Sequence, residues 1–247
     1  KEGRTFNQSS YLNSAEGEFF LIDKQLVKHQ PKVNIGKAEG VSIKFKMPDE
    51  GYYNAYYMQR RIDEGVQYID VAKAEVLKHS CQLGHDFDVQ QMQPQRNENV
   101  PLEITRLRFD DENFHTRFSS GKNVLFKVLF NGEPLAAADV TITTEEGWAR
   151  HSQSDADGIA SFKVIQDRFK DEHKENEKEE NSRHNRRSSE QFLVTVRYKQ
   201  DIAGEYHGKP YQHTIYSSTF PGVFTTSQSI YKSSAYALSF GSAGFLL

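Results

Sequence analysis

The segment at residues 123–164 constrains the fold of this chain more than any other, because strand patterns and tight-turn sequences alternate along it. Near its start, apolar side chains recur at every second position, at Val124, Phe126, Val128 and Phe130. Residues 140–143 are β-branched, and residues 159–164 return to the alternating pattern. β-Branched and aromatic residues at a period of two are typical of strands. The segment therefore predicts one continuous β-unit at the core of a sandwich.

Turn sequences separate the strands of this unit. NGEP at residues 131–134 and SDADG at residues 154–158 supply glycine for positive φ, and Asn or Asp for local hydrogen bonds to the backbone. Asp155 and Asp157 also resemble part of a calcium loop, but the further carboxylates and the late Glu of an EF-hand are missing. A tight turn is favoured over a calcium site.

Similar patterns along the rest of the chain predict an all-β fold. Strands are expected at residues 18–27, 41–47, 52–61, 102–109, 191–198 and 214–220, the last of these closing the sheet. Residues 66–79 are ambiguous, because their apolar residues fit both helical and strand spacing, and a short helical turn leading into a strand is favoured. The expected architecture is two Ig-like or prealbumin-like β-sandwich lobes in tandem, with long polar loops.

Shifts in composition divide the chain into four segments: a polar arm at residues 1–16, an N-terminal β-rich lobe at residues 17–97, a prealbumin-like sandwich at residues 98–220, and a C-terminal tail at residues 221–247. Residues 167–190 are almost entirely polar or charged and cannot bury enough surface to offset their ordering entropy. They predict a solvated hairpin loop. The tail could add an edge strand at residues 236–240, dock, lead into an anchor, or join subunits of a homo-oligomer.

Composition excludes several classes of protein. The net charge of −3 gives no case for nucleic-acid binding, which calls for a basic patch. No apolar run approaches the roughly 20 residues of a membrane helix. Cys81 is the only cysteine, so no disulfide can form within the chain. Lys1 stands where Met would begin a nascent chain, which favours a periplasmic or extracellular protein with its signal peptide removed.

Residues 100–165 resemble the DUF4198 family of bacterial periplasmic proteins, which includes NikM- or NikK-like accessory components of nickel and cobalt uptake. The matching residues are 101–104 (PLEI), Gly132, 134–136 (PLA), Val140 and 155–158 (DADG), with 51–53 (GYY) and 68–74 (YIDVAKA) upstream. The resemblance implies a secreted or periplasmic β-sandwich protein tied to transition-metal uptake, with a metal ion or a membrane transporter component as its partner. The GEPLAAADVTI portion also resembles prealbumin-like, carboxypeptidase-regulatory-like modules.

The most chemically distinctive stretch is HSCQLGH at residues 79–85. Imidazole and thiolate ligands suit Ni, Co, Cu or Zn, and on a strand His79 and Cys81 would project from the same face. His85 could fold back across the turn at Gly84. The alternative is that Cys81 is a small buried hydrophobe and that both histidines are loop residues.

Aromatic residues offer a second kind of site. Trp148 could form a platform for a sugar or a protein partner together with Tyr52, Tyr53, Tyr56 and Tyr57. Cross-strand aromatic pairing within a sheet is the favoured alternative. No Gly-x-Ser-x-Gly, phosphate-binding glycine loop or His-Glu-x-x-His motif is present.

The expected function is a non-catalytic binding protein, with transition-metal uptake as its specific form. The first alternative is a structural or adhesion module that binds protein or glycan through edge strands and an aromatic surface. A hydrolase with a dispersed site is the remaining alternative.

Overall fold

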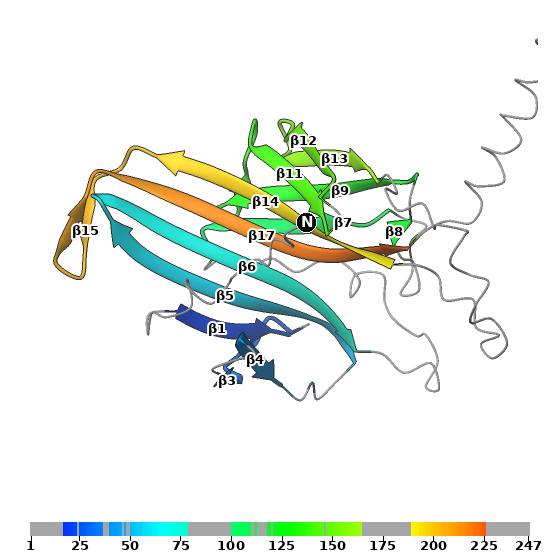
Figure 1. Cartoon of the computed structure of the whole chain (residues 1–247), viewed down its shortest axis with the longest axis horizontal. Coiled ribbons are helices and arrows are strands. Elements are labelled where there is room, and N and C mark those ends of the chain that lie inside the picture. Colours follow the sequence, from blue (N-terminus) through cyan, green and yellow to red (C-terminus); the bar gives the residue numbers. More distant parts are fainter. Residues whose placement is uncertain are drawn as a thin grey trace, which may run out of the picture.

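The computed structural model describes residues 17–23, 25–36, 40–45, 47, 50–78, 100–109, 112, 118–119, 121–145, 147–164 and 189–225. These residues form strands joined by turns and short connections, so the all-β prediction is confirmed (Figure 1). Within this part of the chain no helix is long and apolar enough to cross a membrane.

A nine-stranded sheet forms the larger layer of the molecule. Its strands are, in spatial order, β12 (Ala149–Gln153), β11 (Asp139–Thr144), β14 (Ser189–Gln200), β17 (His213–Thr225), β6 (Val66–Lys78), β5 (Gly51–Asp63), β1 (Gly17–Ile22) and β2 (Lys28–His29). β8 (Phe118–Ser119) pairs with the end of β17. β17 runs parallel to β6 and β8, whereas the other neighbouring strands are antiparallel.

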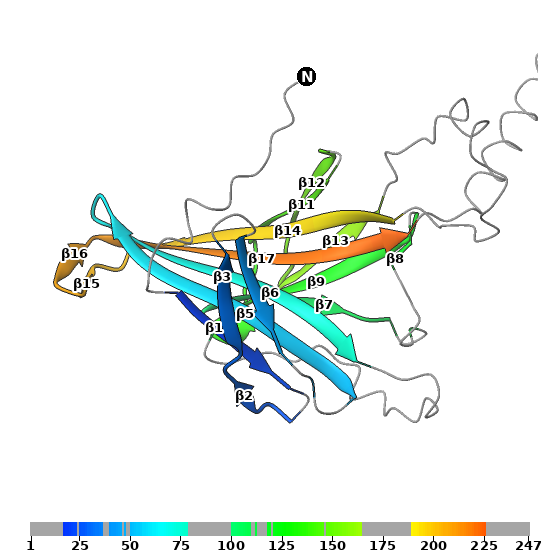
Figure 2. The ribbon, with the colours of Figure 1, turned by 60° about the horizontal axis from the view of Figure 1, so that its bottom comes forward.

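A four-stranded sheet covers part of this layer. It contains β7 (Leu102–Leu107), β9 (Asn123–Phe130), β10 (Glu133–Pro134) and β13 (Ile159–Lys163). Two hairpins complete the described fold, β3 (Lys32–Gly36) with β4 (Gly40–Lys44), and β15 (Gly204–Tyr206) with β16 (Lys209–Tyr211). The first hairpin runs across the direction of β5 (Figure 2), and Phe45 after β4 packs against Tyr53 of β5.

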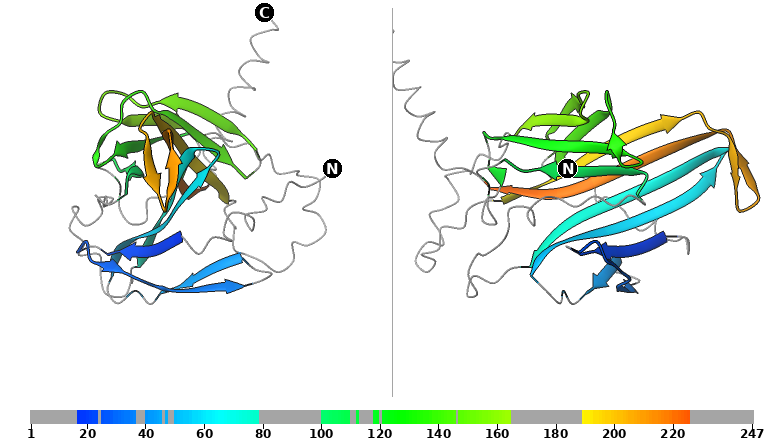
Figure 3. Two further views of the ribbon diagram at one scale, coloured as in Figure 1. Left: turned by 90° about the vertical axis from the view of Figure 1, so that its left-hand side faces the viewer. Right: turned by 180° about the vertical axis from the view of Figure 1, so that it is seen from behind.

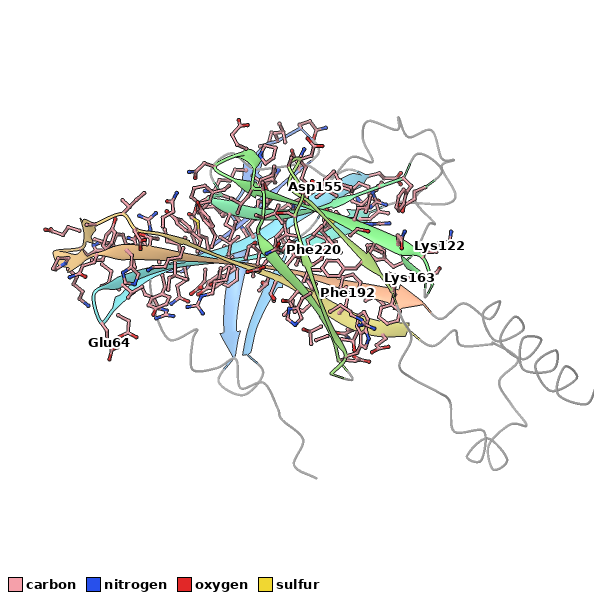
Figure 4. The ribbon with its side chains drawn as sticks, turned by 90° about the horizontal axis from the view of Figure 1, so that it is seen from above. Glu64, Lys122, Asp155, Lys163, Phe192 and Phe220 are labelled. Carbon is pink, nitrogen blue, oxygen red and sulfur yellow. The ribbon has the colours of Figure 1, made fainter. Side chains whose placement is uncertain are left out.

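The main hydrophobic core lies between the two sheets. Alternate residues of facing strands supply it, including Phe126 and Val128 of β9, Val140 and Ile142 of β11, and Phe192 and Val194 of β14. Phe126 is fully buried, and its ring centroid lies 5.7–6.4 Å from those of Phe118, Phe162, Phe192 and Phe220. Figure 4 shows Phe192 and Phe220 in this layered region. The segment at residues 123–164 thus supplies strands to both sheets of the sandwich.

Residues 66–78 are strand throughout, so the prediction of a helical turn there is wrong. Every residue of β5 pairs with a residue of β6. Glu64 and Gly65 join the two strands with φ values of 49° and 75°, the left-handed conformations of a two-residue type I′ turn. The apolar residues of β6 also fit the spacing of a helix, but hydrogen bonding to β5 and β17 on its two sides keeps the strand extended.

Most of the described N-terminal strands belong to the same sheet as the C-terminal strands, and only β3 and β4 pair apart from it. β6 pairs with β17 from Val66↔His213 to Ala72↔Thr219, which places β1, β5 and β6 in the same sheet as the C-terminal strands. A second, smaller core of Phe20, Ile22, Tyr56, Val71 and Val100 lies within this N-terminal part. The predicted boundary near residue 97 falls outside the described residues and stays a prediction.

One connection and the position of one strand differ from the prediction. β13 belongs to the four-stranded sheet and β14 to the nine-stranded sheet, so the charged segment at residues 167–190 does not join a hairpin. β17 lies between β14 and β6 rather than closing an edge.

β12 and the β15–β16 hairpin were not predicted, because their short strands are mostly exposed and carry little apolar signal. The predicted strand at residues 236–240 lies outside the described part.

Four strands extend beyond the sandwich and form an arm, which we define as residues 60–69 and 197–216 (Figures 1 and 3). β1 pairs with β5 only as far as Gln59, and β11 pairs with β14 only as far as Val196. Figure 4 places Glu64 at the far end of the arm, away from Phe192 and Phe220. The arm is therefore a four-stranded extension of the nine-stranded sheet with its own two edges, and it includes the β15–β16 hairpin.

Candidate functional site

The predicted transition-metal ligands His79, Cys81 and His85 lie outside the described residues, so the metal site stays a prediction. Within the part of the chain that the structure describes, no three His, Cys, Asp or Glu side chains are grouped so as to hold a metal ion.

Asp155 serves the turn between β12 and β13. Its Oδ1 accepts hydrogen bonds from the backbone N–H groups of Asp157 at 3.0 Å and Ile159 at 2.8 Å. Gly158 follows with a φ of 75°, and a Cβ there would lie 2.6 Å from the Val128 carbonyl oxygen. These contacts account for the DADG sequence as a turn. Calcium binding by Asp155 and Asp157 stays a prediction.

The predicted aromatic platform is not formed. Consecutive residues of a strand point to opposite faces, so Tyr52 and Tyr56 lie on one face of β5 and Tyr53 and Tyr57 on the other. Tyr56 stacks on Phe20 of β1 at 5.0 Å, and Tyr57 lies 4.3 Å from Phe19. Trp148 packs against the sandwich core. The favoured alternative, cross-strand aromatic pairing, is confirmed.

The Asp23 carboxylate stabilises the turn after β1 by accepting hydrogen bonds. Its Oδ1 accepts hydrogen bonds from the backbone N–H groups of Gln25 and Val27, both at 2.9 Å, and its Oδ2 lies 2.6 Å from Nε2 of His29. Burial would raise the pKa of Asp23, but the hydrogen bonds from these three residues outweigh it and hold the pKa below 3.8.

We expect Asp23→Asn to lower the free energy of unfolding by about 1 kcal/mol at neutral pH, because the substitution removes the charge while keeping the shape. A lowered carboxyl pKa stabilises the fold above the unfolded-state pKa, and this stabilisation is lost as the pH falls through the folded-state pKa. Urea unfolding over a pH series should therefore show the difference shrinking below pH 3.8. A difference that stays constant with pH would contradict this assignment.

The arm carries the most distinctive surface of the described chain, which we call the tyrosine cluster: Tyr198, Tyr206, Tyr211, Tyr216 and Arg60. Strand register aligns part of it. Arg60 pairs with Ile69, Ile69 with Tyr216, and Tyr216 with Tyr198, so these residues form one row across four strands. Their side chains share one face of the arm.

The β15–β16 hairpin brings the other two tyrosines to this face. His207 and Gly208 form its two-residue turn, with φ values of 50° and 76°. The Arg60 guanidinium lies 5.1 Å from the centroid of the Tyr206 ring, within the range of a cation–π contact. The backbone N–H of Gln212 donates to the Gly65 carbonyl at 2.9 Å, which holds the hairpin beside the β5–β6 turn (Figure 3, left).

An aromatic side chain of the four-stranded sheet packs against two rings of the tyrosine cluster. Phe130 of β9 lies 4.8 Å from Tyr198 and 5.0 Å from Tyr216, and the two tyrosine rings are 6.4 Å apart. Burial and the neighbouring Tyr211 raise the pKa of Tyr216, against the effect of Arg60. The hydroxyl therefore stays protonated at neutral pH, and it donates a hydrogen bond to Oε1 of Gln200 at 3.4 Å.

The four tyrosines are all half-buried, and Tyr198 and Tyr216 also pack against the main hydrophobic core. With the guanidinium of Arg60 and the carboxamide of Gln200, the surface combines apolar ring faces with hydrogen-bond donors and acceptors. This combination is typical of binding surfaces, because rigid aromatic side chains give contact area at a small entropic cost.

The edges of the arm are charged. Arg61 and Asp63 lie on β5, where the Arg61 guanidinium stacks 4.0 Å from the Tyr68 ring centroid on the opposite face. Arg197 and Lys199 lie on the free end of β14 and are exposed. Charged side chains on an edge disfavour the addition of another strand. The broad face of the arm is thus a better candidate for ligand binding than its edges.

Sequence reasoning missed the tyrosine cluster. A signal was available, since EYHGKPY at residues 205–211 places a two-residue turn ending in glycine between short segments that contain tyrosine. The parallel pairing of β6 with β17, which brings Arg60 toward the hairpin, has no local signature.

No protein-family model and no curated protein sequence matches this chain. Among solved structures, it shows a likeness to the Bacteroides ovatus mixed-linkage glucan utilization locus protein SGBP-B in complex with a mixed-linkage heptasaccharide. The sequence identity is 6% and the TM-score 0.19. The likeness covers 85% of this chain and 62% of that one, so this chain spans less than two thirds of that protein's length. At this score the likeness carries no argument about fold or ligand.

Proposed function

We propose that the protein is a non-catalytic binding module that holds a hydroxyl-rich ligand, of the glycan class, on the tyrosine cluster. The observation that supports this proposal is the convergence of Tyr198, Tyr206 and Tyr216 with Arg60 on one face of the arm. The periplasmic or extracellular location predicted from the sequence accords with such a role.

The chemistry of the cluster favours a glycan over an added strand or an apolar peptide. A sugar ring offers apolar C–H groups, which suit the faces of tyrosine rings, and hydroxyl groups that both donate and accept hydrogen bonds. Tyrosine hydroxyls and the Gln200 carboxamide can do both in return, and Arg60 donates. A strand would need an open backbone edge, and the edges of the arm carry Arg61, Asp63, Arg197 and Lys199.

A glycan microarray probed with the full chain should identify a bound oligosaccharide, and calorimetric titration should then give its affinity. Tyr206→Ala and Tyr198→Ala are expected to weaken binding by about tenfold or more, because aromatic anchors dominate binding energy. Tyr68→Ala is the matched control, since Tyr68 is also half-buried beside an arginine but lies on the opposite face. Equal affinities for all three variants, or no bound glycan, would overturn the proposal.

The transition-metal form of the predicted function rests on the sequence of residues 79–85 and the DUF4198 resemblance. We expect chain purified without a chelating tag, then incubated with Ni, Co, Cu or Zn at micromolar concentration, to retain metal by elemental mass spectrometry. His79→Ala and Cys81→Ala should each reduce the retained metal, because each removes a soft or borderline ligand. Metal retention that is absent, or unchanged in both variants, would exclude this form.

A further inference from the structure

A lysine and a glutamate meet inside the fold where β7 packs on β6. Lys73 of β6 is 1% exposed and Glu103 of β7 is 2% exposed. The Lys73 Nζ lies 2.9 Å from Oε1 of Glu103. Burying two charges is costly, because both lose their hydration, and the attraction between them repays this cost only in part. A reaction that removes both charges would therefore also remove this cost, which an exposed pair does not pay.

The smaller core and the side chain of Glu75 both lie near this pair. Phe20, Ile22, Val71 and Val100 form the smaller core together with Tyr56, the residue opposite Lys73 in the β5–β6 register. The burial of Lys73 and Glu103 keeps both groups away from water. An amide carries no charge, so it is better suited to a buried position than an ammonium and a carboxylate.

Two hydroxyl groups position the pair. The Tyr56 hydroxyl donates a hydrogen bond to Oε1 of Glu103 at 2.6 Å. The Lys73 Nζ also donates to Oγ1 of Thr105 at 3.2 Å. The tyrosine thus points its proton at the oxygen on which negative charge would develop during an attack at the glutamate carbon. Thr105 helps to hold the amine in place.

A second carboxyl lies close by. Glu75 is two residues after Lys73 on the same strand, so both side chains project from the same face of β6. Burial raises the pKa of Glu75, against the effects of Lys73, Arg108 and Arg106. Its Oε1 has no hydrogen-bond partner among the described residues. A carboxyl of this kind can carry a proton between neighbouring groups.

We propose that Lys73 and Glu103 condense to an amide that joins β6 to β7 covalently. The Lys73 ammonium first gives one proton to Oε2 of Glu103, which leaves a neutral amine and a neutral acid whose Oε1 still accepts the Tyr56 hydrogen bond. The Nζ lone pair then attacks Cδ of Glu103, and Tyr56 donates a hydrogen bond to the oxygen that becomes negative. Glu75, in its neutral form, gives its proton to the departing hydroxyl, which leaves as water, and takes one proton from Nζ in exchange.

This step balances without a further reactant. One N–C bond forms and one C–O bond breaks, one water molecule leaves, and nothing is oxidised or reduced. The net charge of the pair is zero before and after the step. Because β6 and β7 hold the two groups in contact across the two sheets, the reaction is intramolecular and does not need the activation that a free amine and a free acid would need.

Intact-mass spectrometry of the purified full chain is the direct test. We expect the measured mass to fall below the sequence mass by that of one water molecule. Proteolysis should then release a branched peptide that joins Lys73 to Glu103. Lys73→Arg keeps the positive charge but cannot condense in this way, so this variant should have the full sequence mass.

Two further variants test the assigned roles. Tyr56→Phe and Glu75→Gln should both reduce the fraction of chain that has lost water after native incubation, with near-ultraviolet circular dichroism confirming that the variants fold. Wild-type chain that keeps the full sequence mass after prolonged native incubation overturns the proposal. Loss of water that maps elsewhere, or that persists in Lys73→Arg, overturns it as well.

Discussion

Replacing Phe126 with alanine is expected to lower the free energy of unfolding by about 3–5 kcal/mol, the cost of removing a large side chain from a core that cannot close around the cavity. Phe126 lies at the centre of the sandwich, fully buried among Phe118, Phe162, Phe192 and Phe220. These rings come from both sheets, so none of them can fill the space without moving a strand.

Urea unfolding followed by tyrosine and tryptophan fluorescence measures this loss. Leu193→Ala is a suitable control, because Leu193 is 39% exposed on the opposite face of β14, and a surface change of this kind typically costs about 0.5 kcal/mol or less. If Phe126→Ala and Leu193→Ala had similar effects, the sandwich core would not be centred on Phe126.

Replacing Lys73 with methionine is expected to cost a similar amount, about 3–5 kcal/mol, because it removes the cation that contacts the buried carboxyl of Glu103. The methionine side chain is close to lysine in volume, so the loss reports on charge rather than on a cavity. Tyr56 still donates its hydrogen bond to Oε1 of Glu103 in this variant.

The double variant Lys73→Met/Glu103→Met separates the causes of this loss. Replacing a buried ion pair with apolar side chains is often neutral or stabilising, so the double variant should recover most of the stability if the pair is only ionic. If the amide is formed, the double variant also lacks the link between β6 and β7 and stays well below the wild type. A single variant as stable as the wild type would contradict both arrangements.

The strands that could be predicted have long alternating patterns bounded by turn residues. β9, β11, β13 and β14 are of this kind, and each lies close to its expected position. β6 could not be predicted with the same ease, because Ile69, Ala72 and Val76 also fit a helical face. Its extended form depends on β5 and β17, strands that stand on either side of it in the sheet.

The candidate sites depended on contacts that local sequence does not specify. Lys73 lies in YIDVAKA and Glu103 in PLEI, and both motifs stand out in the sequence, but their chemical pairing requires β7 to pack on β6. The tyrosine cluster requires the parallel register of β6 with β17 in addition to the β15–β16 hairpin. Strand alternation predicts which residues share a face, but not which strands become neighbours.

The position of β17 has a consequence for synthesis on the ribosome. β17 is the last strand of the described chain, but it lies between β14 and β6 and joins the N-terminal strands to the rest of the sheet. Until residues 213–219 emerge, the backbone of β6 along that edge lacks the partner that it has in the finished fold. An open strand edge invites pairing with other chains. A nascent chain of this protein is therefore expected to expose this edge of β6 to other chains until residues 213–219 have left the ribosome.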